Sequence, residues 1–469
     1  MIETDSTFRR PLELALNAAL SYLQALETTP VAAQVDAHVL RSRLHKTLAR
    51  EGIAADCVID ELIADVDGGL NGSAGGRFFA WVIGGSLPAA LAADWLTSAW
   101  DQNAAQFQSA PAAAIVEEVA GAWLKELFGL PSEASFAIVT GCQMAHVTCL
   151  AAARHRLLVQ RGWDVEQKGL YGAPAIRIIT SDAHHGSLER AVKLLGMGLE
   201  HIVSVPTSND GALRIDGLSK ALDAGDTPAI VLLAAGDINT GVFDSFETLI
   251  PVAKRHGAWV HVDGAFGLWA GASPAYRHFT RGVNQADSWA SDGHKLLNVP
   301  FDSGFAFMRD AQSHRAAMFQ PAPYIAVTED VRDPFVWNPE WSRRARGFST
   351  YAALRELGRD GISSLVERCC KHAHAIVMGI AQLEGAELLW EPTFNQGLVR
   401  FIDPRPGAVQ EDHDRRTDTV IDAIVNHGEA FFGGTTWRGQ RAMRVSVCNW
   451  QTNESDVERA IRAAKNCLT

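Results

Sequence analysis

An apolar strand pattern that ends in an acidic residue, 258-AWVHVDGAFG-267, decides the fold class of this chain. Six similar short runs lie between residues 135 and 309, and helix-forming stretches separate most of them. They are SFAIVTG at 135, AIRIIT at 175, HIVSVP at 201, AIVLLAAG at 229, DSWAS at 287 and SGFAFMR at 303. Strands that are apolar on both faces and alternate with helices form a mostly parallel sheet that is covered on both sides. The sequence therefore predicts an α/β domain.

The composition is that of a globular protein with a large core. The chain has 469 residues, is 47% hydrophobic and 20% charged, and carries a formal net charge of −12. This acidic balance, with no basic cluster beyond Arg343, Arg344 and Arg346, argues against nucleic acid and anionic membranes as partners. No run approaches about 18 uncharged apolar residues, so we expect no transmembrane span.

The cysteines and the first residues indicate the compartment. Seven cysteines without a C-x-x-C pair are typical of reduced thiols. The first 27 residues, MIETDSTFRRPLELALNAALSYLQALE, have the pattern of an amphipathic helix and not of a signal peptide. We therefore expect a cytoplasmic protein.

The chain divides into three predicted segments. Residues 1–75 form a helical arm that ends in the glycine-rich 66-VDGGLNGSAGGR-77, residues 76–340 form the large α/β domain, and residues 341–469 form a small α+β domain. Within the large domain, the pattern from 110 to 129 predicts a helix with Ile115, Val119, Trp123 and Leu127 on one face.

Three features are expected nearer the C-terminus. Residues 311–341 lack a clear period and predict a long loop. GLVRFID at 397 and MRVSVCNW at 443 are predicted strands of the small domain, and Ser455 with Glu458 predicts a capping box that begins a last helix.

Unusual residues follow several of the strands of the large domain. In an open α/β sheet, ligands bind outside the carboxyl ends of the strands. After the first run, 140-TGCQMAH-146 is a glycine turn that enters a helix. It either binds an anion through backbone N–H groups or is an ordinary connection between a strand and a helix. After the second run, 182-DAHHGSLERA-191 places His184 and His185 before a helix, where a histidine is often a satisfied helix-terminal residue.

A carboxylate and a lysine follow two later runs. Asp263 ends an apolar strand, and a buried carboxylate needs a cationic partner unless it caps the next helix. Lys295 follows the next strand in 287-DSWASDGHKLLNVPFDSG-304, with His294 beside it and Ser291 four residues before it. A lysine beside an apolar site loses its proton and becomes a Schiff-base nucleophile, whereas a single G-H-K is usually a solvated turn. The order of anion turn, histidine, aspartate and lysine indicates pyridoxal phosphate (PLP).

A metal site is the alternative reading of the histidines. His261 and Asp263 are two residues apart on a strand and so point to the same face, as metal ligands do, and His184 and His185 would complete the set. A strand histidine covered by a helix explains the same pattern, and we predict no metal.

These motifs, taken together, resemble the group II pyridoxal-phosphate-dependent amino-acid decarboxylases, the family of the aromatic-amino-acid and glutamate decarboxylases. The likeness runs from about Phe78 to Trp450 and is strongest in SLERA at 187, NTGVFDSFETL at 239, WVHVDGAFG at 259 and the GHK turn. It implies the fold of the PLP-dependent transferases (aspartate aminotransferase-like, fold type I). It also implies PLP as cofactor and decarboxylation of an L-amino acid to the amine and CO₂.

The resemblance implies catalytic roles for three residues. Lys295 would form the Schiff base, Asp263 would pair with the ring nitrogen of PLP, and His185 would lie over the ring and assist protonation. The cofactor phosphate would be held by the glycine turn and two side chains, namely Gly141, Cys142, Gln143, Ser291 and His294.

Further implied contacts surround the ring and the substrate. Ala265 would pack beneath the ring, and Asn239 would bond to the ring hydroxyl. Trp81 and Val82 would recognise the substrate side chain, which favours an aromatic or apolar amino acid over an acidic one. Enzymes of this fold build their site at a dimer interface, so we also expect a homodimer.

Three departures from the family pattern keep other reactions open. The phosphate turn, GCQM, is bulkier than usual, and Gly84 stands where aromatic decarboxylases often have a hydroxyl residue. The stretch 325–342 lacks the family's proton-donating tyrosine and has Phe335 and Trp337 among its aromatics, with Tyr324 just before it. Because Phe in place of this tyrosine is associated with aldehyde formation in the family, the alternative is an aldehyde synthase, a carbon–carbon lyase or an aminotransferase on the same fold.

Overall fold

The computed structural model describes residues 4–323 and 331–468 and divides the chain into two compact units. The large unit consists of residues 84–374 and 390–397. The small unit consists of residues up to 83, 375–389 and 398 onward. The three-segment division expected from the sequence remains a prediction.

The large unit is built on a seven-stranded sheet of order β1-β7-β6-β5-β4-β2-β3. Neighbouring strands from β3 to β6 run parallel, and β7 runs antiparallel to both β1 and β6. The predicted mostly parallel sheet is therefore confirmed. The strands are β1 (Ser135–Val139), β2 (Arg177–Ser181), β3 (Ile202–Val205), β4 (Ala229–Ala234), β5 (Trp259–Asp263), β6 (Ser288–Asp292) and β7 (Gly304–Met308).

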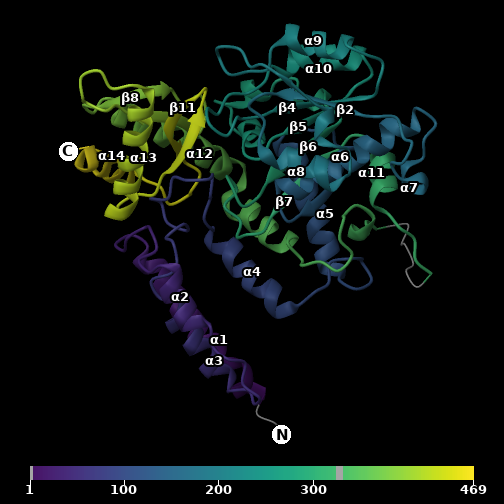
Figure 1. Cartoon of the computed structure of the whole chain (residues 1–469). Helices are drawn as coiled ribbons and strands as arrows, with labels where there is room; N and C mark the ends of the chain where they lie inside the picture. The colour runs from purple at the N-terminus through teal and green to yellow at the C-terminus, as the bar shows by residue number, and fades with distance from the viewer. Residues whose placement is uncertain (1–3, 324–330, 469) are drawn as a thin grey trace. The chain divides into compact units, whose positions relative to one another are not determined.

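Helices cover both faces of this sheet (Figure 1). The long helix α6 packs against β1, β5, β6 and β7, and α9 and α10 pack against β2, β3 and β5 from the other side. The apolar core between α6 and the sheet contains small and branched side chains that let the helix lie close to the strands. The helices are α4 (Pro88–Trp100), α5 (Pro111–Leu127), α6 (Cys142–Val159), α7 (Val165–Lys168), α8 (Gly186–Leu194), α9 (Ile215–Asp223), α10 (Phe246–Arg255) and α11 (Ala311–Met318).

Strand register brings the candidate residues to one edge of the sheet. Ala234 at the end of β4 lies beside Asp263 at the end of β5, and Asp263 lies beside Ala290 of β6. The turns that follow these strands therefore lie together at the carboxyl-end edge of the sheet. Five 3-10 helices complete the connections: Leu199–His201, Gly267–Ala272, Arg277–Thr280, Val283–Gln285 and Pro334–Val336.

The small unit combines a helical arm with a second sheet. In the arm, α3 (Ala55–Val66) packs against both α1 (Thr4–Ala25) and α2 (Ala37–Leu44). The sheet has the order β10-β11-β9-β8, and α13 packs on β11 and on α14. The elements are β8 (Ala386–Trp390), β9 (Gln396–Phe401), α13 (Gln410–His427), β10 (Gly433–Trp437), β11 (Gln440–Ser446) and α14 (Glu454–Leu468). The two predicted strands, β9 and β11, are confirmed, and the sequence missed β8 and β10.

Two expectations about local structure are wrong. Residues 311–318 do not belong to a loop but form α11, whose N-terminus is capped by the Asp310 carboxylate accepting from the backbone of Gln312 and Ser313. The capping box of α14 is formed by Asn453 and Asp456 and not by the predicted pair two residues later. In each case an Asp or Asn side chain closer to the helix start satisfies the free N–H groups. A long helix, α12 (Gly347–Ala381), follows the region 311–341 and is interrupted at Gly358.

The helix α5 is confirmed, but its buried face differs from the predicted one. Ile115 is 42% exposed. The buried residues are instead Ala113, Ala114, Glu117, Ala120, Gly121, Leu124 and Leu127. Small residues let this face of α5 pack closely on the rest of the large unit, and a glutamate lies in the middle of the face. The spacing of the large apolar residues did not reveal this face, because it consists mostly of alanine and glycine.

Two arginines compensate the buried charge of Glu117. Its carboxylate, on a residue that is 1% exposed, lies 2.7 Å from Arg343 Nη1 and 3.2 Å from Arg332 Nη1. Arg343 also donates to the carbonyls of Ala104 and Ile138, and Arg332 stacks over the ring of Phe136. These bonds attach the segment after residue 331 to α5 and β1.

No described helix is long and apolar enough to cross a membrane. All seven cysteines are free, and five of them are buried.

We expect Glu117→Ala to lower the free energy of unfolding by about 3–5 kcal/mol, because it leaves two buried guanidinium groups without their carboxylate. Chemical denaturation measures this loss. Glu118→Ala, at the exposed neighbour, is the control and should change stability by less than about 0.5 kcal/mol. Equal effects of the two changes would contradict the ion cluster.

Candidate active site

A cavity of about 590 Å³ opens at the carboxyl ends of the strands of the large unit. Its lining comes from the turns after β1, β2, β4, β5 and β6, as expected for an open α/β sheet. Eight of the residues singled out from the sequence line it together: Gly141, Cys142, Gln143, His185, Asp263, Ala265, His294 and Lys295.

Four other predicted residues are not among those that line the cavity. Ser291 is fully buried, and its hydroxyl donates to the carbonyl of Gly264 at 2.9 Å. The backbone N–H of Asn239 donates to Asp237, and Asp237 lies at the cavity wall instead. Trp81 and Val82 belong to the small unit.

The start of α6 forms one wall of the cavity. A side chain on Gly304 of β7 would come within 2.3 Å of the Gly141 Cα, so a glycine there lets the turn pack closely on the sheet. The backbone N–H of Cys142 donates to Asp292 Oδ1 at 2.5 Å. Gln143 Nε2 is buried without a hydrogen-bond partner, which leaves an amide donor for a ligand at this helix N-terminus.

Lys295 lies deep in the cavity and is paired with an anion. Its Nζ is 3.0 Å from Asp292 Oδ2, and it lies 5.9 Å from the centre of the Phe266 ring. Burial opposes the charge on the amine, but Asp292, together with Cys142 and Asp263, outweighs it and raises the pKa of Lys295. The setting of this lysine is therefore not simply apolar, because Asp292 lies beside it.

His294 presents a donor to the same wall. Its Nδ1 accepts the backbone N–H of Ser303 at 3.2 Å, and its ring stacks on Phe301. Burial lowers the pKa of His294, and a neutral ring that accepts at Nδ1 carries its proton on Nε2. This Nε2 lies 3.5 Å from Asp292 Oδ1 and close to Gly141.

Asp263 is held as an anion at the end of β5. Burial opposes its ionisation, but contacts with His146, and the charges of His185 and Lys295, outweigh it and lower the pKa of Asp263. Its Oδ1 accepts the backbone N–H of Ala265 at 3.1 Å. The carboxylate lines the cavity and can pair there with a protonated nitrogen.

The two adjacent histidines have different environments. His184 has both ring nitrogens engaged, with the carbonyl of Ser181 at 2.8 Å and with Glu189 at 3.2 Å. His185 caps α8 by accepting the N–H of Ser187 at Nδ1, while its ring remains exposed at the cavity. This difference favours His185 as the residue that faces a ligand.

Sequence reasoning missed two residues of this site. Asp292 ends β6 three residues before Lys295 and contacts Lys295, His294 and the N-terminus of α6. Its position after an apolar strand was a usable signal. His146 lies four residues after Cys142 on α6 and is fully buried behind Asp263. His146 and Asp263 come together only through the packing of α6 on β5.

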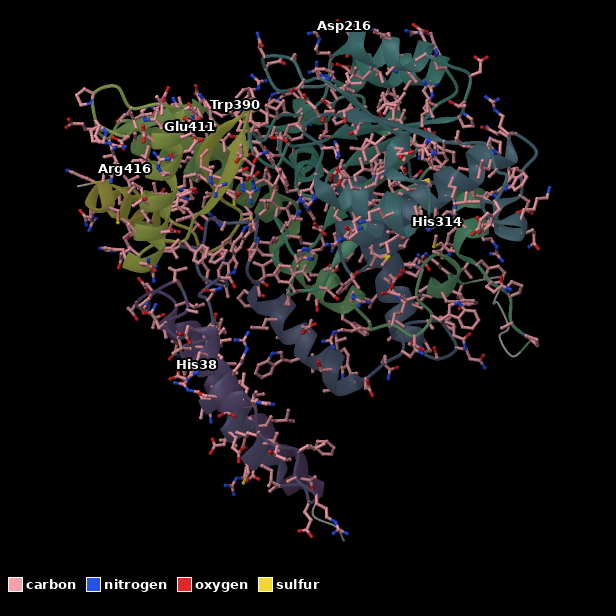
Figure 2. All side chains as sticks on the ribbon, in the orientation of Figure 1. His38, Asp216, His314, Trp390, Glu411 and Arg416 are labelled. Atoms are coloured by element: carbon pink, nitrogen blue, oxygen red, sulfur yellow. The ribbon has the colours of Figure 1, made fainter. Side chains whose placement is uncertain are left out.

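The described residues 331–342 do not place an aromatic side chain in the lining of the cavity. Phe335 is 1% exposed and packs on Phe319 and Trp341. Trp337 packs on His314, which is labelled in Figure 2, and its carbonyl lies 2.7 Å from His314 Nε2. Tyr324, the other candidate, lies outside the described residues.

The histidines and Asp263 do not form the metal set considered from the sequence. His261 is bonded to His146 and to Ser288, away from His184 and His185. Cys142, His146 and Asp263 place ligand atoms within 4.8 Å of one another. These atoms already contact one another in pairs, at 3.4–3.8 Å.

Comparisons with known proteins agree with this arrangement. The model of the pyridoxal-dependent decarboxylase conserved domain matches residues 41–402, more than half of the chain. Acidic amino acid decarboxylase GADL1 of Mus musculus is 27% identical over 401 residues, which cover 81% of this chain and 72% of the relative. The 4-hydroxyphenylacetaldehyde synthase of Rhodiola rosea is 27% identical over 460 residues, which cover 95% of this chain and 92% of the relative.

Solved structures confirm the fold. The crystal structure of Oryza sativa TDC with PLP and tryptamine superposes with a TM-score of 0.92 at 23% identity and covers 100% of this chain and 99% of its own. The predicted fold, that of the PLP-dependent transferases of fold type I, is therefore confirmed.

The residues present in the cavity fit pyridoxal phosphate. The free amide donor of Gln143 and the helix start at Gly141 suit the phosphate, and the anionic Asp263 suits the ring nitrogen. Lys295 presents an amine in the same cavity, which would suit the cofactor aldehyde.

We expect Gly84→Ala to abolish tight retention of PLP. A Cβ at this position would lie 2.0 Å from the carbonyl oxygen of Lys295, so the loop that carries the lysine must shift. Dialysis followed by measurement of bound cofactor tests this. Gly52→Ala, where a Cβ would have nothing within 4 Å, is the control and should retain PLP. Full retention in Gly84→Ala would show that the close approach is not required.

Proposed function

This chain belongs to the pyridoxal-dependent decarboxylase family, and from that premise we propose that it removes the α-carboxylate of an L-amino acid as CO₂ and releases the amine. The observation that carries the proposal is the meeting of Lys295, Asp263 and His185 in one cavity. Few reactions other than those of PLP need an amine, an anion for a ring nitrogen and an imidazole together.

We assign the roles of the chain's residues from this arrangement. Lys295 binds the cofactor covalently and gives way to the substrate amine. When bound, PLP supplies an electron sink that accepts the electron pair left by the departing CO₂. Asp263 holds a proton on the ring nitrogen, and His185 lies over the ring.

The remaining predicted contacts complete the proposed site. The phosphate lies at the start of α6, near His294, and Ser291 supports this wall through its bond to Gly264. Ala265 packs beneath the ring, and Asn239 is proposed for the ring hydroxyl. The set proposed for the phosphate is Gly141, Cys142, Gln143 and His294, and Ser291, which was also predicted for it, lies behind this wall.

Substrate selection is assigned to the segment that contains Trp81 and Val82. Both have positive φ angles, of 54° and 59°, which is an uncommon conformation for residues with large or branched side chains. Trp81 is 54% exposed and packs against Phe78 and Phe431. An exposed indole held in a strained backbone favours an aromatic or apolar substrate.

An aldehyde synthase is the second candidate. The Rhodiola rosea relative carries that activity in its name, and Phe335 and Trp337, two of the described aromatics of the loop region, pack on other side chains that do not line the cavity. The competing reaction consumes O₂ and water and yields the aldehyde, CO₂, ammonia and H₂O₂. Carbon–carbon lyase and aminotransferase activity are further outcomes on the same fold.

We expect a panel of L-amino acids to yield at least one amine that is lighter than its substrate by CO₂, together with equimolar CO₂. Product mass spectrometry with a peroxide assay measures this. Lys295→Ala should lose both the product and the visible absorbance of bound cofactor. Aldehyde with stoichiometric peroxide would show that the protein is an aldehyde synthase and not a decarboxylase. A keto acid would show that it is an aminotransferase.

We further propose that the protein is a cytoplasmic homodimer. One stripe of α1 exposes four large apolar side chains to solvent in the single chain, with exposed fractions of 69% for Phe8, 58% for Leu12, 43% for Leu16 and 47% for Leu20. Residues four apart lie on one face of a helix, and a stripe of this kind suits burial against a second copy of the chain.

We expect light scattering at micromolar concentration to give about twice the chain mass of 50.7 kDa. Leu12→Glu with Leu16→Glu should shift the protein toward monomer, because two charges would be buried in the contact. Asn17→Glu, which adds a charge on the same helix outside the stripe, is the control and should leave the dimer intact. A monomer mass for the unaltered chain would contradict the assembly.

A further inference from the structure

A row of buried side chains leads from Asp263 into the interior between α6 and the sheet. His146 Nε2 lies 3.4 Å from Asp263 Oδ2, and His146 Nδ1 lies 2.9 Å from His261 Nε2. His261 Nδ1 lies 2.8 Å from Ser288 Oγ, which also receives the indole N–H of Trp259 at 2.8 Å.

Every member of this row behind Asp263 is removed from water. His146, His261 and Ser288 are fully buried, and Trp259 is 4% exposed. The two imidazole rings meet edge to face at 82°. Buried polar networks of this kind are stable only if each donor meets an acceptor.

The two ends of the row decide the direction of its hydrogen bonds. An ionised carboxylate only accepts, so His146 must present an N–H at Nε2. If His146 is neutral, its Nδ1 then accepts from Nε2–H of His261. His261 in turn accepts at Nδ1 from the hydroxyl of Ser288, which still accepts the N–H of Trp259. This arrangement gives every one of these groups a hydrogen-bond partner.

The electrostatics of the flanking groups agree with a neutral His261 and an anionic Asp263. Burial, with the neighbouring His146, lowers the pKa of His261 to about 3, so it is neutral at physiological pH. Burial also raises the pKa of the Cys142 thiol, so this close neighbour of Asp263 adds no second negative charge. Asp263 is therefore the anion that His146 faces.

We propose that His146, oriented by His261 and Ser288, is a positioning residue that keeps Asp263 ionised and aimed at the ring nitrogen of bound PLP. The inference rests on the role of Asp263 in the proposed function. It names the three residues that would maintain that role, none of which lines the cavity.

The test compares the binding of PLP with that of its analogue in which C–H replaces the ring nitrogen. An ionised Asp263 favours PLP, because only PLP offers a protonated nitrogen. We expect His146→Ala to reduce the preference for PLP at least about tenfold, as loss of a charge-assisted hydrogen bond does. Affinity for the analogue should change less than about twofold. Titration of the cofactor-free protein by absorbance gives both dissociation constants.

Two variants separate positioning from packing. His146→Gln keeps an N–H donor for Asp263 and should retain most of the preference. His314→Ala removes another fully buried histidine of the large unit, which bonds to Ser135 and Trp337 and not to Asp263. It should lower thermal stability but leave the preference unchanged.

Each outcome decides the proposal. An unchanged preference in His146→Ala, or an equal loss in His314→Ala, overturns it. If His146→Ala does not fold, Ser288→Ala takes its place and should reduce the preference about threefold through the loss of one hydrogen bond; no reduction overturns the proposal. The readout needs no turnover, so absence of amine product would reject the proposed function without affecting this test.

Discussion

The structure of the site depends on one constraint, the burial of the Asp263 carboxylate at the end of β5. An isolated buried carboxylate is costly, and it becomes protonated unless donors and cations surround it. Here the backbone of Ala265, the imidazole of His146 and the charges of His185 and Lys295 act together on it. Much of the architecture around α6 and β5 serves to provide these partners.

A second carboxylate, Asp292, contacts a different set of donors in the cavity from those that contact Asp263. It takes the Lys295 ammonium and the amide at the start of α6, and it faces Nε2 of His294. Asp263 is thereby left to the backbone N–H of Ala265, to the imidazole of His146 and to the more distant charges of His185 and Lys295. The two anions lie on neighbouring strands, and the parallel register of β5 and β6 sets their spacing.

The sequence was sufficient to predict the fold class, the strands of the large sheet and most of the cavity wall, because these follow from apolar runs and from the residues after them. Asp263 and Lys295 are examples: Asp263 ends β5, Lys295 lies in the turn three residues after β6, and their chain order carries chemical meaning. His146 was out of reach, since its partner on β5 is 115 residues away and only the packing of α6 joins them. The buried face of α5 was missed for a related reason, because it is made of alanines, a glycine and a glutamate whose charge is compensated by residues more than 200 positions away.

The choice between amine and aldehyde does not depend on this buried machinery. Both reactions need the same amine, the same anion beside the ring nitrogen and the same loss of CO₂, so Lys295, Asp263 and the His146 row serve either equally. The reactions diverge only afterwards, when the carbon that carried CO₂ either receives a proton or meets O₂. Phe335 and Trp337 are held by Phe319, Trp341 and His314, and they contribute no proton. Among the described residues that line the cavity, the side chains of His184, His185, His294 and Lys295 can carry a transferable proton, and His185 and Lys295 are the two to which we assign roles beside the ring. Which product forms would depend on whether such a group reaches the carbon before oxygen does.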